Sequence, residues 1–170
     1  FFKFMTKRSI ETEFVHAGER RPLPKGQPNA TPIFASSTYS YESMEEAELV
    51  FTGELQDYIY TRYGNPTVDA FQEALAVLES GAVARAYSSG MAALHAALLA
   101  SDLTNGSVVL ASRDLYGASF DLLYKVFGAF GVKTQLADFS DLVELKQKVE
   151  ELKPRVLLGE TISNPLLKVL

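Results

Sequence analysis

The chain has 170 residues, of which 47% are hydrophobic and 22% charged, an ordinary composition for a globular domain. The net charge of −5 argues against nucleic-acid binding driven by phosphate neutralisation, and the absence of cysteine from this sequence excludes disulfides, thiolate metal sites and a cysteine nucleophile. No apolar run approaches the length of a membrane-spanning helix, so we expect a cytoplasmic protein with neither membrane nor nucleic acid as partner.

Residues 1–42 are predicted to form an extended arm. Prolines interrupt this stretch and it shows little helical periodicity. An arm of this length without a core of its own needs a surface to lie on, and we expect a partner subunit to provide it.

Regular elements begin after the arm. Ser43 followed by Glu46 resembles a capping box and predicts a helix toward Phe51. Asn65-Pro66 begins a second predicted helix, which Gly81 ends.

The rest of the chain alternates between short apolar runs and longer periodic ones. The predicted strands are 84–88, 107–112, 132–137 and 155–160, and the predicted helices between them are 91–100, 118–130 and 141–152. This alternation predicts an α/β fold with a mostly parallel sheet and right-handed crossovers. Ligands bind beyond the carboxyl ends of strands in such folds, so we expect chemistry at 88–91, 112–117 and 160–165.

The first of these ends is a turn of small residues that leads into a helix. Unpaired N–H groups and the helix dipole suit a phosphate there, Gly90 permits close approach, and Ser88 and Ser89 add hydroxyl donors. Small residues also begin many ordinary helices, and that alternative stays open.

The other two ends carry an aromatic side chain and an amide. Tyr116 can stack on a planar ligand or pack in the protein interior, and Asn164, placed before a proline, can face a ligand or bond its own backbone. Between the first two helices, Arg62 with Tyr60 can grip a phosphate or face solvent. His16 and His95 have no second histidine at metal-ligand spacing, so we predict no metal.

Four segments together resemble one family, the pyridoxal-phosphate enzymes of cysteine and methionine metabolism. The family includes cystathionine γ-synthase, cystathionine γ- and β-lyases, methionine γ-lyase and O-acetylhomoserine sulfhydrylase. The segments are Tyr60-Thr61-Arg62-Tyr63-Gly64-Asn65-Pro66-Thr67, Ser88-Ser89-Gly90-Met91-Ala92-Ala93, Leu115-Tyr116-Gly117 and Glu160-Thr161-Ile162-Ser163-Asn164-Pro165. The resemblance implies the aspartate aminotransferase-like large domain, with helices on both faces of the sheet, for residues 43–170.

The resemblance also implies roles for single residues. Ser89, Gly90 and Met91 would bind the phosphate of pyridoxal 5'-phosphate, joined by Tyr60 and Arg62 from a neighbouring subunit of a homo-oligomer, a dimer of dimers. A second set of roles concerns the cofactor ring and the amino-acid substrate. Tyr116 would stack on the ring and aid proton transfer, Asn164 would lie near the ring's 3-oxygen, and Glu160 and Tyr60 would contact the substrate.

The chain departs from the family at its Schiff-base lysine. None of the nine lysines has the Ser-x-Thr-Lys-like setting of that residue, and an aspartate for the pyridine nitrogen is likewise missing. We therefore expect a truncated large domain, the amino-terminal part of a longer lyase or transferase acting by γ- or β-elimination or replacement on cystathionine, methionine or an O-acylhomoserine. We expect the chain alone to be inactive, and the alternative is a non-catalytic remnant that binds phosphate or a partner subunit.

Overall fold

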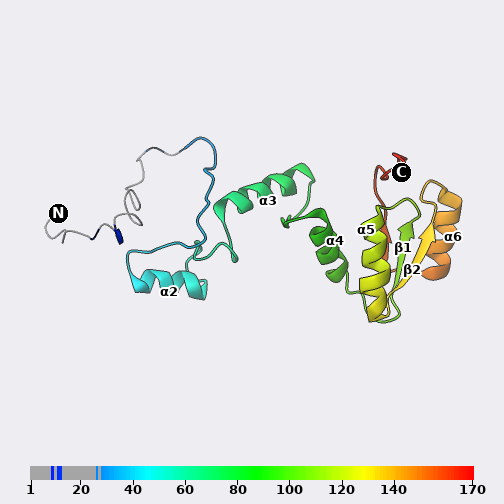
Figure 1. Cartoon of the computed structure of the whole chain (residues 1–170), viewed down its shortest axis with the longest axis horizontal. Helices are drawn as coiled ribbons and strands as arrows, with labels where there is room; N and C mark the ends of the chain where they lie inside the picture. Colours follow the sequence, from blue (N-terminus) through cyan, green and yellow to red (C-terminus); the bar gives the residue numbers. More distant parts are fainter. Residues whose placement is uncertain (1–8, 10, 13–25, 27) are drawn as a thin grey trace. The chain divides into compact units, whose positions relative to one another are not determined.

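A computed structural model describes residues 9, 11–12, 26 and 28–170 (Figure 1). The chain divides into two compact units, residues 1–70 and 71–170. The predicted boundary between an arm at 1–42 and a domain at 43–170 stays a prediction, because most of the arm lies outside the described residues. Across the described part of the chain, no helix combines the length and apolar character needed to cross a membrane.

The first unit contains helix α2 (Met44–Thr52), which begins where the capping pattern predicts. The Ser43 hydroxyl accepts a hydrogen bond from the Glu46 N–H at 3.1 Å, and Gly53 ends the helix with a φ of 81°. Glycine adopts this left-handed conformation without the steric cost that a side chain brings.

An extended segment beside α2 is bonded to its own chain. The Tyr39 N–H donates to the Ile59 carbonyl at 3.1 Å, and the Thr61 N–H donates to the Ser37 carbonyl at 2.9 Å. The last residues of the predicted arm are therefore held by the loop that carries Tyr60 and Arg62.

Helix α3 (Pro66–Leu78) begins at the predicted Asn-Pro pair. The Asn65 side-chain oxygen accepts from the Thr67 N–H at 2.9 Å, and Gly81 follows the helix end, donating its N–H to the Ala76 carbonyl at 2.8 Å. These caps satisfy backbone groups that a helix leaves open at each end.

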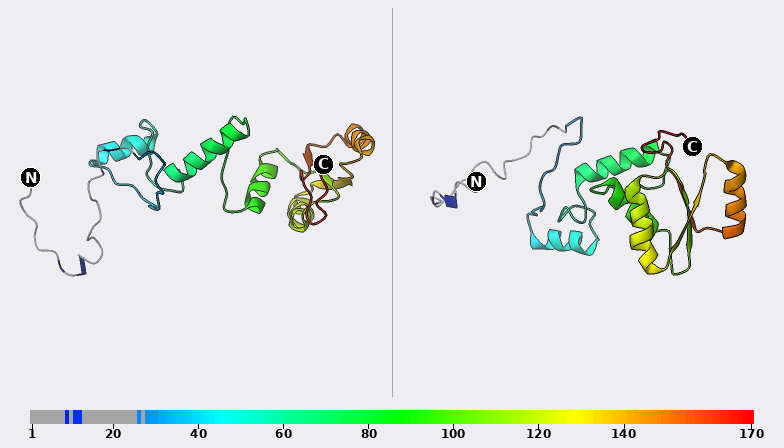
Figure 2. Two further views of the ribbon diagram at one scale, coloured as in Figure 1. Left: turned by 90° about the horizontal axis from the view of Figure 1, so that it is seen from above. Right: turned by 45° about the vertical axis from the view of Figure 1, so that its right-hand side comes forward.

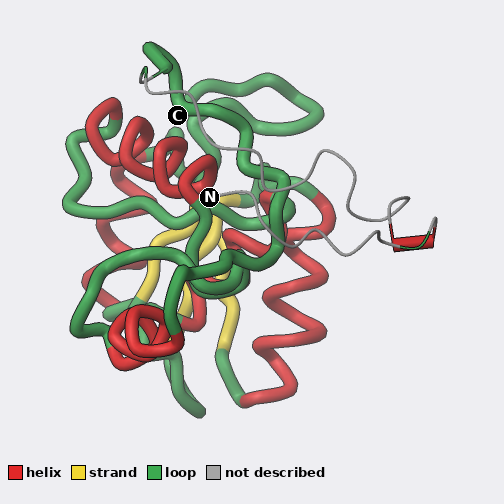
Figure 3. The backbone as a smooth tube through the Cα atoms, turned by 90° about the vertical axis from the view of Figure 1, so that its left-hand side faces the viewer, coloured by secondary structure: helices red, strands yellow, loops and turns green. Residues whose placement is uncertain are grey.

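The second unit contains a parallel three-stranded sheet in the order β2-β1-β3. Its strands are β1 (Val108–Ser112), β2 (Lys133–Ala137) and β3 (Val156–Leu158), and all pairings are parallel. Figure 2 shows α5 (Gly117–Asp121) and α6 (Leu142–Leu152) on opposite faces of this sheet, whose strands are yellow in Figure 3. The predicted α/β fold with helices on both faces is confirmed.

The core of the second unit lies on the face of the sheet that α5 covers. Helix α5 continues through a π-helical turn (Leu122–Phe127) and a 3-10 turn (Gly128–Phe130), so the helix predicted over 118–130 is present with an irregular centre. Helix α4 (Gly90–Leu99) contributes Leu98 to this core. The buried members of the core cluster are Leu98, Val109, Ala111, Leu115, Leu122, Leu123, Phe127 and Val132.

The predicted strand at 84–88 is wrong. No strand pairs with this segment among the described residues, and the Ala86 N–H donates to the Gln72 side-chain oxygen at 3.0 Å. A short apolar run becomes a strand only when a neighbouring strand supplies ladder hydrogen bonds, and here the Ala86 N–H bonds a side chain instead. The strand predicted at 155–160 is shorter than expected, Val156–Leu158.

Candidate active site

The start of α4 presents two N–H groups without an acceptor among the described residues. Ser89 is the N-cap, and its hydroxyl oxygen accepts from the Ala92 N–H at 3.1 Å. Gly90 and Met91 supply the next N–H groups, and a Cβ placed on Gly90 would meet nothing within 4 Å. A helix N-terminus with free N–H donors suits an anion, and the Ser89 O–H stays available to donate.

The turn between β1 and α5, which carries Tyr116, packs on the same apolar cluster as the start of α4. Leu115 is a buried member of this cluster, and Met91, in the first turn of α4, packs against it. The same apolar side chains therefore hold both the turn and the start of the helix. The Tyr116 side chain is 48% exposed, and its backbone N–H donates to a carboxylate oxygen of Glu160 at 2.8 Å. Tyr116 thus combines an accessible ring with a fixed backbone.

The segment after β3 folds back as a small hairpin. Ile162 bridges Val169 in antiparallel fashion, and the buried Ser163 donates its N–H to the Lys168 carbonyl at 2.8 Å and accepts from the Lys168 N–H on its hydroxyl at 3.0 Å. Asn164 is exposed in the turn of this hairpin. The site residues predicted at 88–91, 112–117 and 160–165 therefore lie in the second unit, although no strand precedes the first of these segments.

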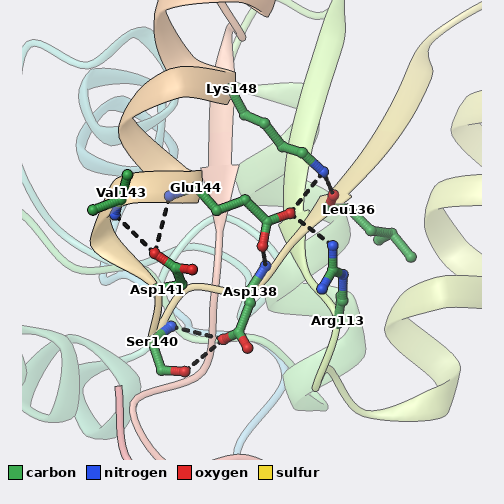
Figure 4. A network of polar contacts seen from close by, with 8 residues as sticks. All are labelled: Arg113, Leu136, Asp138, Ser140, Asp141, Val143, Glu144 and Lys148. Atoms are coloured by element: carbon green, nitrogen blue, oxygen red, sulfur yellow. Dashed lines mark hydrogen bonds and ion pairs between the residues drawn. The ribbon is translucent and has the colours of Figure 1, made fainter.

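A charged network fastens the carboxyl ends of β1 and β2 to the start of α6 (Figure 4). One Glu144 oxygen accepts from Arg113 at 2.7 Å and lies 3.0 Å from the Lys148 ammonium, while the other accepts from the Asp138 N–H at 3.3 Å. The hydrogen bond from Lys148 is the main cause that lowers the pKa of Glu144. The hydrogen bond from the Ser140 hydroxyl, at 2.6 Å, is the main cause that lowers the pKa of Asp138.

This network was not predicted from the sequence. A signal was available in the spacing of Asp141 and Glu144, the pattern of a capped helix start with an acid three residues on. Asp141 is indeed the N-cap of α6 and accepts from the N–H groups of Val143 and Glu144, each at 3.0 Å.

Tyr60 and Arg62 belong to the first unit. The Arg62 guanidinium lies 4.9 Å from the centre of the Tyr60 ring and 5.3 Å from that of Tyr63, so the two rings orient it. The side chain is exposed, and no carboxylate within the described part of the chain pairs with it. Its contact with a phosphate across a subunit boundary stays a prediction.

A cavity of about 410 Å³ in the first unit does not suit a phosphate. The groups that line it include Asp57, Tyr58 and Asp69, and none of its lining residues is a lysine or arginine. Burial, followed by the hydrogen bond to Asp69 at 2.9 Å, raises the pKa of Tyr58 to about 12. The cavity is a neutral-to-acidic hollow beside the Tyr60 loop.

His95 does not contribute to a metal site in the structure. Its ring meets that of Phe127 edge-on, with 5.5 Å between the centroids. The described residues hold no group of three histidine or acidic side chains that could bind a metal. His16 lies outside the described residues.

Comparison with known proteins shows that this chain is similar to pyridoxal-phosphate-dependent enzymes. It is 37% identical over 162 residues to the cystathionine beta-lyase of Lactococcus lactis subsp. cremoris and 36% identical over 165 residues to the L-methionine gamma-lyase of Fusobacterium nucleatum, which cover 95% and 97% of this chain. A crystal structure from Campylobacter jejuni that contains N'-pyridoxyl-lysine-5'-monophosphate superimposes with a TM-score of 0.64 at 29% identity, over 81% of this chain and 34% of that one.

The family model for Cys/Met metabolism PLP-dependent enzymes matches residues 11–170, and the chain belongs to that family. The chain spans 40% of the length of the cystathionine beta-lyase and 41% of the length of the L-methionine gamma-lyase. The described residues fit the family's cofactor, because the N–H groups of Gly90 and Met91 have no acceptor among these residues and the half-exposed Tyr116 follows Leu115, which packs in the same apolar cluster as Met91.

Proposed function

We propose that this chain forms the phosphate- and ring-binding part of an enzyme that carries out β- or γ-elimination or replacement on a sulfur-containing or O-acylated amino acid. The observation that carries the proposal is the start of α4, where the N–H groups of Gly90 and Met91 have no acceptor among the described residues and Gly90 has room for a Cβ. The chain is 37% identical to a β-lyase and 36% identical to a γ-lyase. These identities do not favour one reaction over the other, so the proposal includes reactions at the β-carbon and at the γ-carbon of the substrate.

Each predicted residue has a defined task in this proposal. Ser89, Gly90 and Met91 hold the phosphate by hydrogen bonds, and the α4 dipole adds to them. Tyr116 stacks its exposed ring on the pyridine and places a hydroxyl where a proton is moved, and Asn164 donates its amide toward the ring's 3-oxygen. Pyridoxal phosphate, when bound, supplies the electron sink that stabilises negative charge on the substrate.

The proposal includes assembly into a cytoplasmic homo-oligomer, a dimer of dimers. Exposed Arg62, oriented by Tyr60 and without a carboxylate partner in the described residues, is available to reach the phosphate of a neighbouring subunit. Tyr60 would also touch the amino-acid substrate there. Sedimentation velocity would detect the assembly, and a monomer at every concentration would contradict this part of the proposal.

The test is a titration of the chain with pyridoxal phosphate and with pyridoxal, which lacks the phosphate, followed by absorbance. We expect pyridoxal phosphate to bind more tightly. Gly90→Glu places a carboxylate where the phosphate would lie, and it fits because nothing lies within 4 Å of the new Cβ. An acidic side chain in the first turn also stabilises a helix through the helix dipole, so we expect the Gly90→Glu variant to keep α4 and its fold.

The matched control is Ala97→Glu, which adds the same charge at an exposed position of α4. We expect Gly90→Glu to weaken pyridoxal phosphate binding at least tenfold and to leave pyridoxal binding unchanged, whereas Ala97→Glu changes neither by more than about twofold. Equal weakening by both variants, or no preference for the phosphorylated ligand in the parent chain, would overturn the proposal.

A further inference from the structure

Two side chains from the segment after β3 reach the turn after β1. Glu160 accepts from the Tyr116 N–H at 2.8 Å across 44 positions of sequence, and the Lys168 ammonium lies 2.9 Å from a carboxylate oxygen of Asp114. The Asp114 side chain is only 14% exposed, whereas that of Lys168 is 50% exposed. The turn that carries Tyr116 is therefore held at two points, two residues apart.

The Glu160 contact replaces one that the helix cannot make by itself. Tyr116 is the N-cap of α5 and makes no side-chain cap bond. In a capping box the third helical residue is an acid or amide that reaches back to the N-cap N–H. That position in α5 is Ser119, which is buried and too short, and Glu160 supplies the missing acceptor from another strand end.

The hairpin joins both contacts to Asn164. The Leu167 N–H donates to the Ser163 carbonyl at 2.9 Å and the Ser163 N–H donates to the Lys168 carbonyl at 2.8 Å. Asn164 follows Ser163 directly, so it lies in the chain between the two contact residues, Glu160 and Lys168. Any movement of the hairpin would be transmitted to the turn of Tyr116.

We propose that Glu160 and Lys168 are positioning residues that clamp the Tyr116 turn to the Asn164 hairpin, so that two side chains facing the cofactor ring are delivered as one body. The inference rests on the proposed function for what Tyr116 and Asn164 touch. It assigns the Glu160 carboxylate to a backbone N–H instead of the substrate contact that the family resemblance implies.

The first test measures amide hydrogen exchange of the whole chain by NMR. Glu160→Ala is expected to raise the exchange rate of the Tyr116 N–H about tenfold, because a charge-assisted hydrogen bond is lost. Glu160→Gln is expected to stay within about threefold of the parent chain, because its amide oxygen still accepts. Lys168→Met, which keeps the aliphatic chain, is expected to raise the rate about threefold.

The control variant is Glu151→Ala, which removes an exposed carboxylate from α6 and leaves the Tyr116 rate unchanged. Exchange at Leu110, buried in β1, checks that each variant keeps its fold. An unchanged Tyr116 rate in Glu160→Ala would overturn the clamp, as would a Glu160→Gln variant that loses as much protection as Glu160→Ala.

The second test measures pyridoxal phosphate binding in a double-mutant cycle. Glu160→Ala is expected to weaken binding about fivefold in the parent chain and not at all in a Tyr116→Ala background, because the carboxylate acts through that tyrosine. Additive losses would overturn the clamp. If no variant binds the cofactor while the Tyr116 N–H still depends on Glu160, the proposed function fails and the clamp stands.

Discussion

Asn65 joins three segments of the first unit and offers a direct test of how the Tyr60 loop is held. The side chain is 3% exposed, and its oxygen accepts from the Thr67 N–H at 2.9 Å. Its nitrogen donates to the Phe34 carbonyl at 3.0 Å and contacts the hydroxyls of Thr61 and Tyr39 at 3.1 and 3.3 Å. One amide thus ties the extended segment, the loop and the start of α3.

Replacing Asn65 by alanine removes both functions of the amide. Loss of the helix cap costs about 1 kcal/mol, and loss of the buried donors adds about 1–2 kcal/mol. The sum of about 2–3 kcal/mol corresponds to roughly 30- to 150-fold faster local opening. Asn65→Ser keeps an acceptor for the cap, so it should recover about fivefold at Thr67 relative to alanine.

The assay is amide exchange at Tyr39, Thr61 and Thr67, whose N–H groups donate within this cluster. Asn29→Ala, at an exposed position of the extended segment, is the matched control and should change none of the three rates. Rates within twofold of the parent in Asn65→Ala would refute the reasoning. A serine variant no better than alanine at Thr67 would refute the capping part alone.

Three further outcomes are expected. Borohydride reduction of the chain mixed with pyridoxal phosphate should leave no stoichiometric adduct on any of the nine lysines, by mass spectrometry, because none stands in the family's lysine-bearing segment; one adduct per chain accompanied by turnover would contradict this. Because folding lowers the pKa of Glu144, the ionised side chain stabilises the folded protein at pH values above its ordinary pKa of 4.5. This stabilisation is lost as the pH falls through the lowered pKa. The urea midpoint should therefore drop between pH 6 and 3, and less so in Glu144→Gln; an equal drop in both proteins would count against the network. The pKa of Tyr58 is raised from 10 to about 12, so the neutral side chain makes its whole contribution to folding stability below pH 10. That contribution is lost as the pH rises toward 12. Ultraviolet titration should show a tyrosine ionisation step near pH 12, and Tyr58→Phe should remove that step.

Local patterns predicted most of the helices and the strand ends after β1 and β3. Ser43 caps the helix that its spacing with Glu46 indicates, and Asn65-Pro66 begins α3 as expected. These features depend on residues within about four positions of one another, which is the range over which capping and helical periodicity act. The polar turns after β1 and β3 followed from the rule that ligands bind at the carboxyl ends of parallel strands.

Features that depend on distant partners could not be predicted from the sequence in the same way. The short apolar run at 84–88 is typical of a strand, but the run does not indicate whether a neighbouring strand is present to pair with it. The bond between Arg113 and Glu144 joins positions 31 residues apart, and that between Tyr116 and Glu160 joins positions 44 apart. Only tertiary folding brings such groups together. From the residues around it, Glu160 can be predicted only to be a polar residue near a turn.

The strand order explains why Glu160 meets Tyr116. The chain leaves β1 for β2 on one side and returns to β3 on the other, so the carboxyl ends of β1 and β3 are neighbours. Ala111 is opposite Leu158 in the register, which places Glu160 level with position 113, at the beginning of the Tyr116 turn. Side chains alternate between the faces of a strand, so a slip of one residue would direct Glu160 to the other face. The position of the Tyr116 ring therefore depends on the register of the three residues of β3.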